Sequence, residues 1–159
     1  MLKKANARFL YHRLPPPSPY KTIDTRKVAK LVAMFNSNKL DDLGQHLSEG
    51  RKIHTDFGLW KGCMAGNKQE WKKMVDYNKQ DVILLEKIYL RLRPWIKSHP
   101  NMGIYLDRAV CPKCGSGDIE FRGFTMTTTK KYHRFQCKNC GGWGRKIHSE
   151  HESKVYASL

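Results

Sequence analysis

The longest regular pattern of apolar positions in this chain lies between residues 68 and 93, and it predicts one long amphipathic helix. The stripe recurs with a period near 3.6 residues and comprises Trp71, Met74, Val75, Asn78, Val82, Leu85, Tyr89 and Leu92. Asn67 predicts an N-cap in front of the helix, and Glu70, three residues later, predicts its capping-box partner. Pro94 cannot continue a helix and predicts its end. We therefore expect this stripe to be the buried face of the helix.

Shorter segments ahead of this helix also show helical spacing. Residues 1–13 predict a helix, which the proline-rich run PPPSP ends. Residues 26–36 predict a second helix, which Asp24 or Thr25 can cap, and residues 39–47 predict a third. The N-terminal part of the chain is therefore expected to be mainly helical.

Two other segments of this part predict no helix. The run KTIDT predicts a short strand around Ile23. The glycines spread through residues 50–66 predict a loop. Cys63 stands alone in that segment, and we expect a small buried apolar residue rather than a nucleophile.

The last third of the chain has the composition of a β-hairpin. The run DIEFRGFTMTTTKKYHRFQ is rich in Thr, Phe and Tyr, which favour strands. The polar segment that follows predicts a frayed end. The patterns together predict an α+β protein with a helical region at residues 1–98, a β-ribbon at residues 99–147 and a flexible tail at residues 148–159.

Two cysteine pairs frame the predicted hairpin. Cys111 and Cys114 form one Cys-x-x-Cys pair, Cys137 and Cys140 form the other, and 22 residues separate the pairs. Each pair can close a tight turn with both sulfurs aimed at one point, and a glycine after each pair allows the positive φ that such a turn needs. Four thiolates at one point suit a structural zinc ion with no open coordination position. The segment therefore looks like a zinc ribbon.

Two disulfides are the alternative for these cysteines. The N-terminus is charged at Lys3 and Lys4 and lacks an apolar signal segment, which favours a reducing compartment and hence metal over disulfides. We therefore expect a cytoplasmic protein. His148 and His151 have a metal-like spacing, but four cysteines already complete a zinc site, so no second metal is expected there.

The charge predicts a polyanionic partner. The chain carries 30 Lys and Arg against 14 Asp and Glu, a net charge of +16. Residues 1–100 hold twenty basic and nine acidic residues, and residues 101–159 hold ten and five, so both parts are basic. Such charge suits nucleic acid, with solubility or an acidic membrane as the alternatives. Aromatic residues interleaved with the basic ones favour nucleic acid, and no apolar run of about eighteen residues predicts a membrane span. The candidate nucleic-acid-binding residues are Lys130, Lys131, Arg134, Lys138, Arg145 and Lys146.

The helical region resembles a nuclease family. The runs TIDTRKVAKLV, KLDDLGQHL and MVDYNKQDVILLEKIYLRLRPW are similar to the C-terminal half of DEDD-type 3′–5′ exonucleases of the ribonuclease H-like superfamily. The resemblance covers about residues 1–100 and is nearest to phage exonuclease-like proteins, some of which carry a zinc ribbon. Tyr77-x-x-x-Asp81 matches the third motif of that family. The resemblance implies that Asp81 ligates a catalytic Mg²⁺ or Mn²⁺ ion, that Tyr77 orients the attacking water, and that a phage protein acts in a bacterial cytoplasm.

The first two motifs of that family are missing from this chain. Cleavage by two metal ions needs several carboxylates, and Asp81 is the only one at a matching position. We therefore expect a mainly helical remnant of a ribonuclease H-like domain, followed by the zinc ribbon. Mg²⁺ or Mn²⁺ is expected only if another chain supplies the missing carboxylates. A natural truncation, one half of a split nuclease and an incomplete gene product all fit this expectation.

Three functions remain open on the sequence. The first is a nucleic-acid-binding protein without autonomous catalysis. The second is one piece of a metal-dependent 3′–5′ exonuclease that works with a complementing chain. The third is a protein that docks on a nucleic-acid-processing machine and modulates it. Without the sheet of a complete ribonuclease H-like domain, apolar helix faces are expected to be exposed. A second copy of the chain, in a homo-oligomer, is one partner that could cover them.

Overall fold

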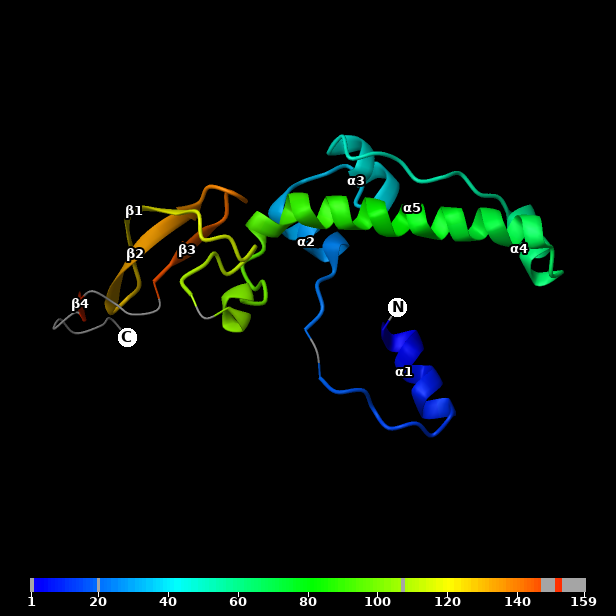
Figure 1. The fold of residues 1–159 in the computed structure, drawn as a ribbon, viewed down its shortest axis with the longest axis horizontal. Helices are drawn as coiled ribbons and strands as arrows, with labels where there is room; N and C mark the ends of the chain where they lie inside the picture. Colours follow the sequence, from blue (N-terminus) through cyan, green and yellow to red (C-terminus); the bar gives the residue numbers. More distant parts are fainter. Residues whose placement is uncertain (1, 20, 107, 147–150, 153–159) are drawn as a thin grey trace.

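The structure is a computed structural model that describes residues 2–19, 21–106, 108–146 and 151–152. It is mixed α+β, as the sequence predicts, with helices in the first two thirds and a small antiparallel sheet near the C-terminal end (Figure 1). The helices are α1 (Leu2–Tyr11), α2 (Thr25–Val32), α3 (Leu40–His46), α4 (Phe57–Met64) and α5 (Lys68–Leu92), and two short 3₁₀ turns, η1 (Arg93–Trp95) and η2 (Met102–Tyr105), follow. The strands are β1 (Ile119–Met126), β2 (Lys130–Cys137), β3 (Trp143–Arg145) and β4 (His151–Glu152).

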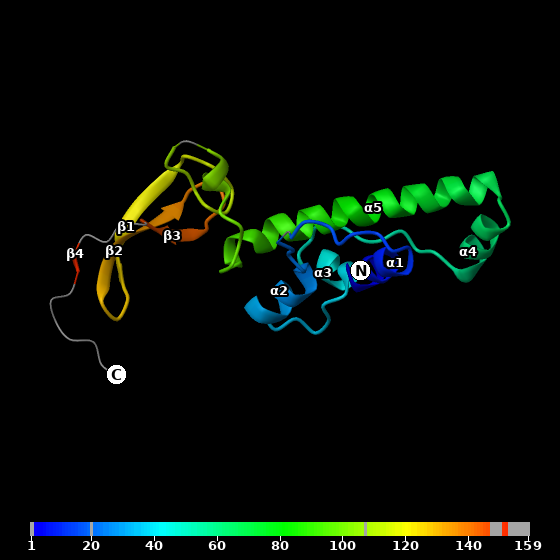
Figure 2. The ribbon, with the colours of Figure 1, turned by 90° about the horizontal axis from the view of Figure 1, so that it is seen from below.

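Helix α5 is the axis of the molecule. Its 25 residues span about 37 Å at 1.5 Å per residue. The sheet lies beyond one end of α5, and α4 folds back beside the other end, whereas α2 and α3 pack on the half nearer the sheet (Figures 1 and 2). In the described part of the chain, no helix combines the length and the apolar character that crossing a bilayer requires.

The core of the helical region lies where α2 and α3 meet α5. It consists of Ala29 from α2, Leu43 from α3, and Leu84, Ile88 and Leu92 from α5. Partly buried apolar side chains such as Val28, Val32 and Phe35 pack around these five residues. The core is small, and it fixes only the half of α5 that is nearer the sheet.

Gly44 allows the close approach of α3 to α5. A Cβ atom at this position would overlap the Gly50 carbonyl oxygen and would also lie against the Leu84 side chain. Such an overlap does not occur for real side chains, so any larger residue would push α3 away from the core.

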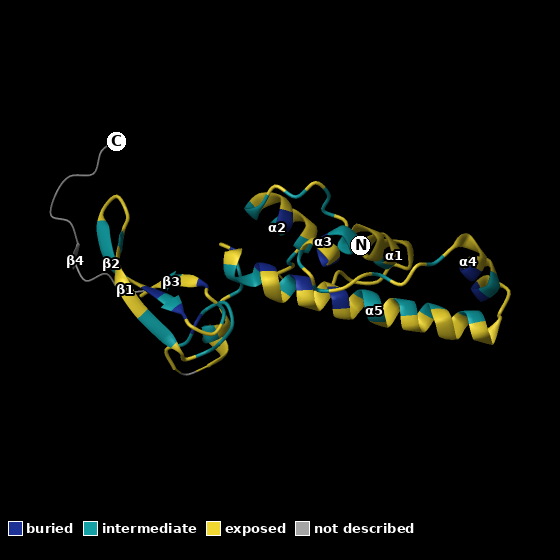
Figure 3. Ribbon diagram, turned by 90° about the horizontal axis from the view of Figure 1, so that it is seen from above, coloured by how far each residue is buried: buried dark blue, intermediate teal, exposed yellow. Residues whose placement is uncertain are grey.

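The buried face of α5 differs from the predicted one. The face that packs carries Leu84, Ile88 and Leu92, and only Leu92 belongs to the expected stripe. Four large members of that stripe are exposed: Trp71, Val75, Val82 and Leu85, at 51%, 45%, 59% and 42%. Helix α5 has two apolar faces about a quarter turn apart, because residues advance by about 100° each. Helices α2 and α3 cover one face, while the other faces solvent (Figure 3).

The N-cap of α5 is confirmed, but its capping box is not. The Asn67 side-chain oxygen accepts hydrogen bonds from the backbone N–H groups of Gln69 (2.9 Å) and Glu70 (3.4 Å). The backbone N–H of Asn67 donates to the Gly62 carbonyl, so it is unavailable to the Glu70 carboxylate. That carboxylate accepts from Lys73 instead, at 3.0 Å.

The segment predicted as a loop at residues 50–66 contains helix α4, so that prediction is wrong. The Asp56 side chain accepts a hydrogen bond from the Leu59 backbone N–H at 3.0 Å and thereby caps the helix. Packing against α5 buries Leu59 and Cys63. Capping and burial together outweigh the cost of about 1 kcal/mol for each glycine inside a helix. Cys63 is a buried free thiol, as expected.

The strand expected around Ile23 is also wrong. Residues 21–24 belong to no regular element and lead directly into α2. Asp24 is the N-cap of α2, as predicted, and accepts from the Lys27 backbone N–H at 3.1 Å. A lone extended segment gains no ladder hydrogen bonds, and none of the strands of the described sheet pairs with residues 21–24. The predicted first helix is present as α1, whose Leu10 and Tyr11 are largely exposed.

The hairpin predicted between the cysteine pairs is formed by β1 and β2. The two strands are antiparallel, with a β-bulge between Phe121 and Phe124. Strand β3 pairs along the other edge of β2 and places Trp143 opposite Gln136. We call the cysteine turns and this sheet the ribbon.

The predicted flexible tail at residues 148–159 lies largely outside the described residues. The exceptions are His151 and Glu152, which differ from the prediction because they form β4 and pair with the first two residues of β2. His148 lies outside the described residues, so the predicted absence of a second metal at His148 and His151 stays a prediction.

Candidate functional site

The four cysteines of the ribbon meet at one point. The sulfur atoms of Cys111, Cys114, Cys137 and Cys140 all lie within 4.8 Å of one another. Each pair lies on a tight turn, closed by hydrogen bonds from Gly115 N–H to the Cys111 carbonyl and from the N–H after Cys140 to the Cys137 carbonyl, both 2.8 Å. The two glycines that follow the pairs have φ values of 76° and 73°, the left-handed conformation that glycine adopts without strain. These are the turns that the spacing predicts.

The sulfur geometry fits a metal ion and not disulfides. The Sγ atoms of Cys111 and Cys140 are 3.7 Å apart, and those of Cys114 and Cys137 are 3.6 Å apart. A tetrahedron with metal–sulfur distances of about 2.3 Å has edges of about 3.8 Å, whereas a disulfide bond is about 2.05 Å long. The cluster is therefore suited to a tetrahedral metal ion such as zinc.

Hydrogen bonds to sulfur support the thiolate form. The Gly142 backbone N–H donates to the Cys140 sulfur at 3.4 Å, and the Asn139 side chain donates to the Cys114 sulfur at 3.7 Å. Burial opposes ionisation of Cys114, but the Ser116 backbone N–H and neighbouring donors outweigh it and lower the pKa of this thiol to about 7. Burial is the main reason that the pKa of Cys140 is raised to about 12 and that of Cys111 is raised. A bound cation removes this penalty, because it compensates the buried negative charge.

One face of the sheet carries two arginines and two aromatic rings. Arg134 on β2 and Arg145 on β3 lie directly opposite each other in the antiparallel register. The Arg134 guanidinium lies over the Trp143 ring at 4.6 Å, and the Arg145 guanidinium lies over the Tyr132 ring at 4.2 Å. Both distances are typical of cation–π contacts. We call these four residues the arginine face.

The opposite face carries lysines over phenylalanine rings. The Lys131 ammonium lies 4.0 Å from the centre of the Phe124 ring, and the Lys146 ammonium lies 5.1 Å from that of Phe121. His133 stacks on Phe124 with ring centres 4.6 Å apart. The sheet therefore presents aromatic rings and positive charge on both of its faces.

Four of the six predicted nucleic-acid-binding residues thus pair with an aromatic ring. Of the other two, Lys130 starts β2 at the hairpin turn, away from the cysteines. Lys138 is exposed in the second cysteine turn, where its charge contributes, after that of Arg122, to a lowered pKa of Glu120. The pairing with rings was not part of the prediction, because it depends on the register of three strands.

The predicted Tyr77–Asp81 pair is bridged by a lysine. Both residues continue the core-facing side of α5 and are half-buried. The Lys52 ammonium lies 2.8 Å from Asp81 Oδ2 and donates to the Tyr77 hydroxyl at 2.9 Å. The bonds to Asp81 and then Tyr77 raise the pKa of Lys52. An internal ammonium therefore lies where the resemblance implies a metal ion.

Within the described ranges, Asp81 belongs to no group of three or more side chains that could share a metal ion. The cysteine cluster is the one group there of three or more His, Cys, Asp or Glu side chains that can share a metal ion. Asp41 is bound elsewhere: it accepts the Lys52 backbone N–H at 2.8 Å and pairs with Arg51 at 3.8 Å. Lys52 was missed by sequence reasoning because it lies in the segment taken as a loop, and its position carries no local signal of a contact 29 residues away.

Comparison of the chain with protein-family models, curated proteins and solved structures finds no match in any of the three. A functional conclusion therefore depends on the residues and the geometry described above.

Proposed function

We propose that this protein binds nucleic acid through a zinc-stabilised ribbon and does not cleave it on its own. Four cysteine sulfurs at tetrahedral spacing, with no oxygen ligand and no open position, favour zinc over harder divalent cations. The ion would be structural, because Phe135 is the one large side chain besides the cysteines that is buried in the described part of the ribbon. Its role is to hold the three strands in the register that creates the arginine face.

The single observation that carries the binding proposal is the arginine pair. Like charges directly opposite each other destabilise a sheet. No carboxylate in the described part of the chain lies within ion-pair distance of Arg134 or Arg145. Two planar guanidinium groups on one face of the sheet are suited to phosphate oxygens, and the adjoining Trp143 and Tyr132 rings are suited to stacked bases. A phosphate backbone supplies the missing negative charge.

The absence of autonomous cleavage follows from the contacts of Asp81. We infer that the helical region descends from a DEDD-type exonuclease and that its third motif now has a structural role. Lys52 neutralises the carboxylate and donates to the Tyr77 hydroxyl, so both groups are engaged. Two-metal hydrolysis needs further carboxylates around the same point, and Asp81 has a lysine there instead.

A mobility-shift experiment tests binding. The purified chain should retard short single strands of unrelated sequence at about 50 mM salt, and Lys131→Glu should weaken all of them alike, because phosphate contacts carry no sequence information. Failure to retard any nucleic acid at low salt would exclude the proposal. It would favour the third function open on the sequence, a protein that docks on a nucleic-acid-processing machine.

A complementing nuclease chain is the second candidate function, and the bare stripe of α5 favours it. Trp71, Val75, Val82 and Leu85 are exposed apolar side chains along one side of a helix whose other side is packed. Strips of this kind mark interaction surfaces. A second chain could cover the strip and displace Lys52 from Asp81. Asp81 would then be free to ligate a metal ion, with Tyr77 beside it.

This second candidate is tested by mixing. The chain is combined with the product of the neighbouring upstream reading frame, and 3′–5′ degradation is measured with Mg²⁺ or Mn²⁺. Activity should appear only in the mixture, Asp81→Asn should abolish it, and Tyr77→Phe should reduce it. Activity that survives Asp81→Asn would show that α5 is only a scaffold.

A further inference from the structure

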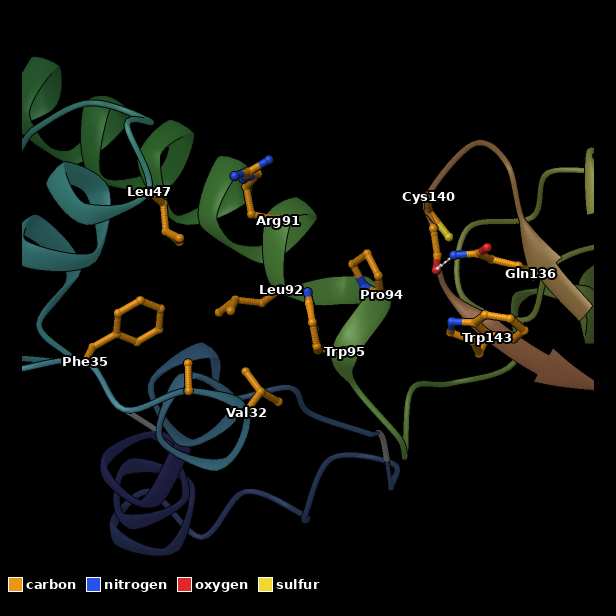
Figure 4. Close-up of a pocket in the computed structure, with 12 residues that line it drawn as sticks. Val32, Phe35, Leu47, Arg91, Leu92, Pro94, Trp95, Gln136, Cys140 and Trp143 are labelled. Atoms are coloured by element: carbon orange, nitrogen blue, oxygen red, sulfur yellow. Dashed lines mark hydrogen bonds between the residues drawn. The ribbon is translucent and has the colours of Figure 1, made fainter. Parts of the chain in front are cut away.

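A cavity of about 670 Å³ lies between the helical region and the ribbon. Figure 4 shows Pro94 and Trp95 on its helical side, facing Gln136 and Trp143 on its ribbon side. Phe35 is among the apolar side chains that line the cavity on its helical side. The volume is in the range of small-molecule sites, which is about 300–1,000 Å³.

The lining of the cavity is apolar and aromatic, with one positive charge. Arg91 is the charged residue among those that line it, and no acidic side chain does. Arg91 pairs through Nε with the Glu49 carboxylate at 3.3 Å. The Gln136 amide nitrogen donates to the Gly141 carbonyl at 3.2 Å, which orients the side chain and leaves its amide oxygen as an acceptor. A flat, largely apolar group with hydrogen-bonding edges fits this lining.

Trp143 connects the cavity to the arginine face. The Trp143 ring lies under the Arg134 guanidinium at 4.6 Å and also lines the cavity. A strand whose phosphates lie on Arg134 and Arg145 therefore has its bases next to the cavity entrance. Trp95, 66% exposed, offers a second ring from the helical side.

We infer that this cavity receives one base of a single-stranded nucleic acid, stacked on Trp143 and Trp95. This inference rests on the proposed function and adds the form of the ligand. Bases inside a duplex present only their edges, whereas bases of a single strand can be splayed out and stacked on aromatic side chains. The cavity thus selects single strands, and the arginine face supplies the affinity that does not depend on the base.

The test compares two probes of equal length and charge. One is a fluorescently labelled oligothymidylate of about ten nucleotides, a typical site size for such binding, and the other is its fully abasic counterpart. Affinities are measured by anisotropy for the full chain, for Trp95→Ala, for Trp95→Phe and for Trp60→Ala. Trp60 is the matched control, because it is a half-exposed tryptophan on α4, away from the cavity.

Trp95→Ala should weaken oligothymidylate binding about tenfold, since stacking on one base contributes about 1–3 kcal/mol. It should leave the affinity for the abasic probe unchanged. Trp95→Phe should restore most of the loss, and Trp60→Ala should change neither affinity. The unfolding midpoint of each variant is measured alongside, and it should not move for Trp95→Ala because that side chain is largely exposed.

Equal affinity of Trp95→Ala and the unaltered chain for both probes would overturn the inference and leave the cavity to another ligand, such as a protein segment. Equal weakening on both probes would also overturn it, because the residue would then act without the base. Neither result contradicts the proposed function. The proposed function is contradicted by a different result, in which the unaltered chain binds neither probe.

Discussion

Positive charge is used differently in the two regions of the molecule. Within the described ranges, four ion pairs lie in the helical region: Arg51–Asp41, Lys52–Asp81, Lys73–Glu70 and Arg91–Glu49. In the described part of the ribbon, Arg122 pairs with Glu120. Four other ribbon cations lie over aromatic rings instead: Lys131, Arg134, Arg145 and Lys146. Both regions are basic, but among the described residues ion pairs are more frequent in the helical region, and cations over aromatic rings are more frequent in the ribbon.

This difference separates structural charge from binding charge. A cation bonded to a carboxylate has its attraction for phosphate largely cancelled, whereas a cation over an aromatic ring keeps its full charge beside a stacking surface. Net charge alone does not distinguish the two arrangements, because residues 1–100 carry +11 and residues 101–159 carry +5. The more highly charged region is therefore not the one for which we propose nucleic-acid contacts.

The largest expected effect is on the ribbon and comes from loss of metal. Cys114→Ser should abolish zinc binding and unfold the ribbon, a loss of several kcal/mol, since binding of a structural zinc ion supplies the folding free energy of such a site. Native mass spectrometry should show one zinc ion per unaltered chain, and hydrogen exchange should show the loss of β1–β2 protection in the variant. Helix α5 should keep its protection.

Cys63→Ala is the matched control, because it removes a buried thiol outside the cluster. It should retain one zinc ion. A ribbon that stays protected in Cys114→Ser without metal would contradict the structural role of the ion.

A smaller effect is expected from breaking the Lys52–Asp81 pair in the helical region. Lys52→Met leaves the half-buried Asp81 carboxylate without its cation and should lower the free energy of unfolding by about 2 kcal/mol. Urea titration measures this. Lys73→Met, which breaks an exposed pair, should cost less than about 0.5 kcal/mol.

The same pair gives a pH test. The bonds of Lys52 to Asp81 and Tyr77 raise its pKa above the ordinary value of 10.5. The contribution of the pair to the free energy of unfolding is therefore complete below the pKa of Lys52 in the unfolded chain, and it is lost as pH rises through the pKa in the folded chain. The difference between the unaltered chain and Lys52→Met should therefore be constant between about pH 7 and pH 10 and shrink above that range. A difference that already disappears near pH 8 would contradict the assignment.

The smallest effect compares arginines of the two regions directly. Arg134→Ala should weaken binding of a single strand about tenfold. The substitution removes the contact of a charged group with a phosphate, and such a loss costs about 1–2 kcal/mol of binding free energy. Arg51→Ala should change it less than twofold, because Asp41 already holds that guanidinium. Anisotropy at fixed salt measures both. Equal losses would show that the protein binds through its total charge and not through the arginine face.

The ribbon was predictable because its signals are local. Cys-x-x-Cys spacing, the following glycines and the hairpin composition each constrain a few neighbouring residues, and the structure has all three. The pairing of Arg134 with Trp143 was not predictable, because it depends on the register of β2 against β3.

The helical region was predictable in its elements but not in its contacts. The existence, N-cap and end of α5 follow from periodicity, Asn67 and Pro94. Which of its two apolar faces packs depends on where α2 and α3 dock, and periodicity contains no such information. The contact of Lys52 with Tyr77 and Asp81 is long-range in sequence and could not be predicted. The sequence therefore indicated a metal-site candidate at Tyr77 and Asp81, whereas in the structure both residues bind the Lys52 ammonium group.

The salt dependence of single-strand binding tests the central claim most directly. The logarithm of the association constant for an oligothymidylate is plotted against the logarithm of salt concentration, for the unaltered chain and for the Arg134→Ala/Arg145→Ala double variant. The unaltered chain should lose affinity steeply between about 50 and 200 mM salt, with a slope of about −0.7 per phosphate neutralised, and the double variant should flatten that slope by about 1 to 2. An unchanged slope in the double variant would contradict the assignment of phosphate contacts to the arginine face.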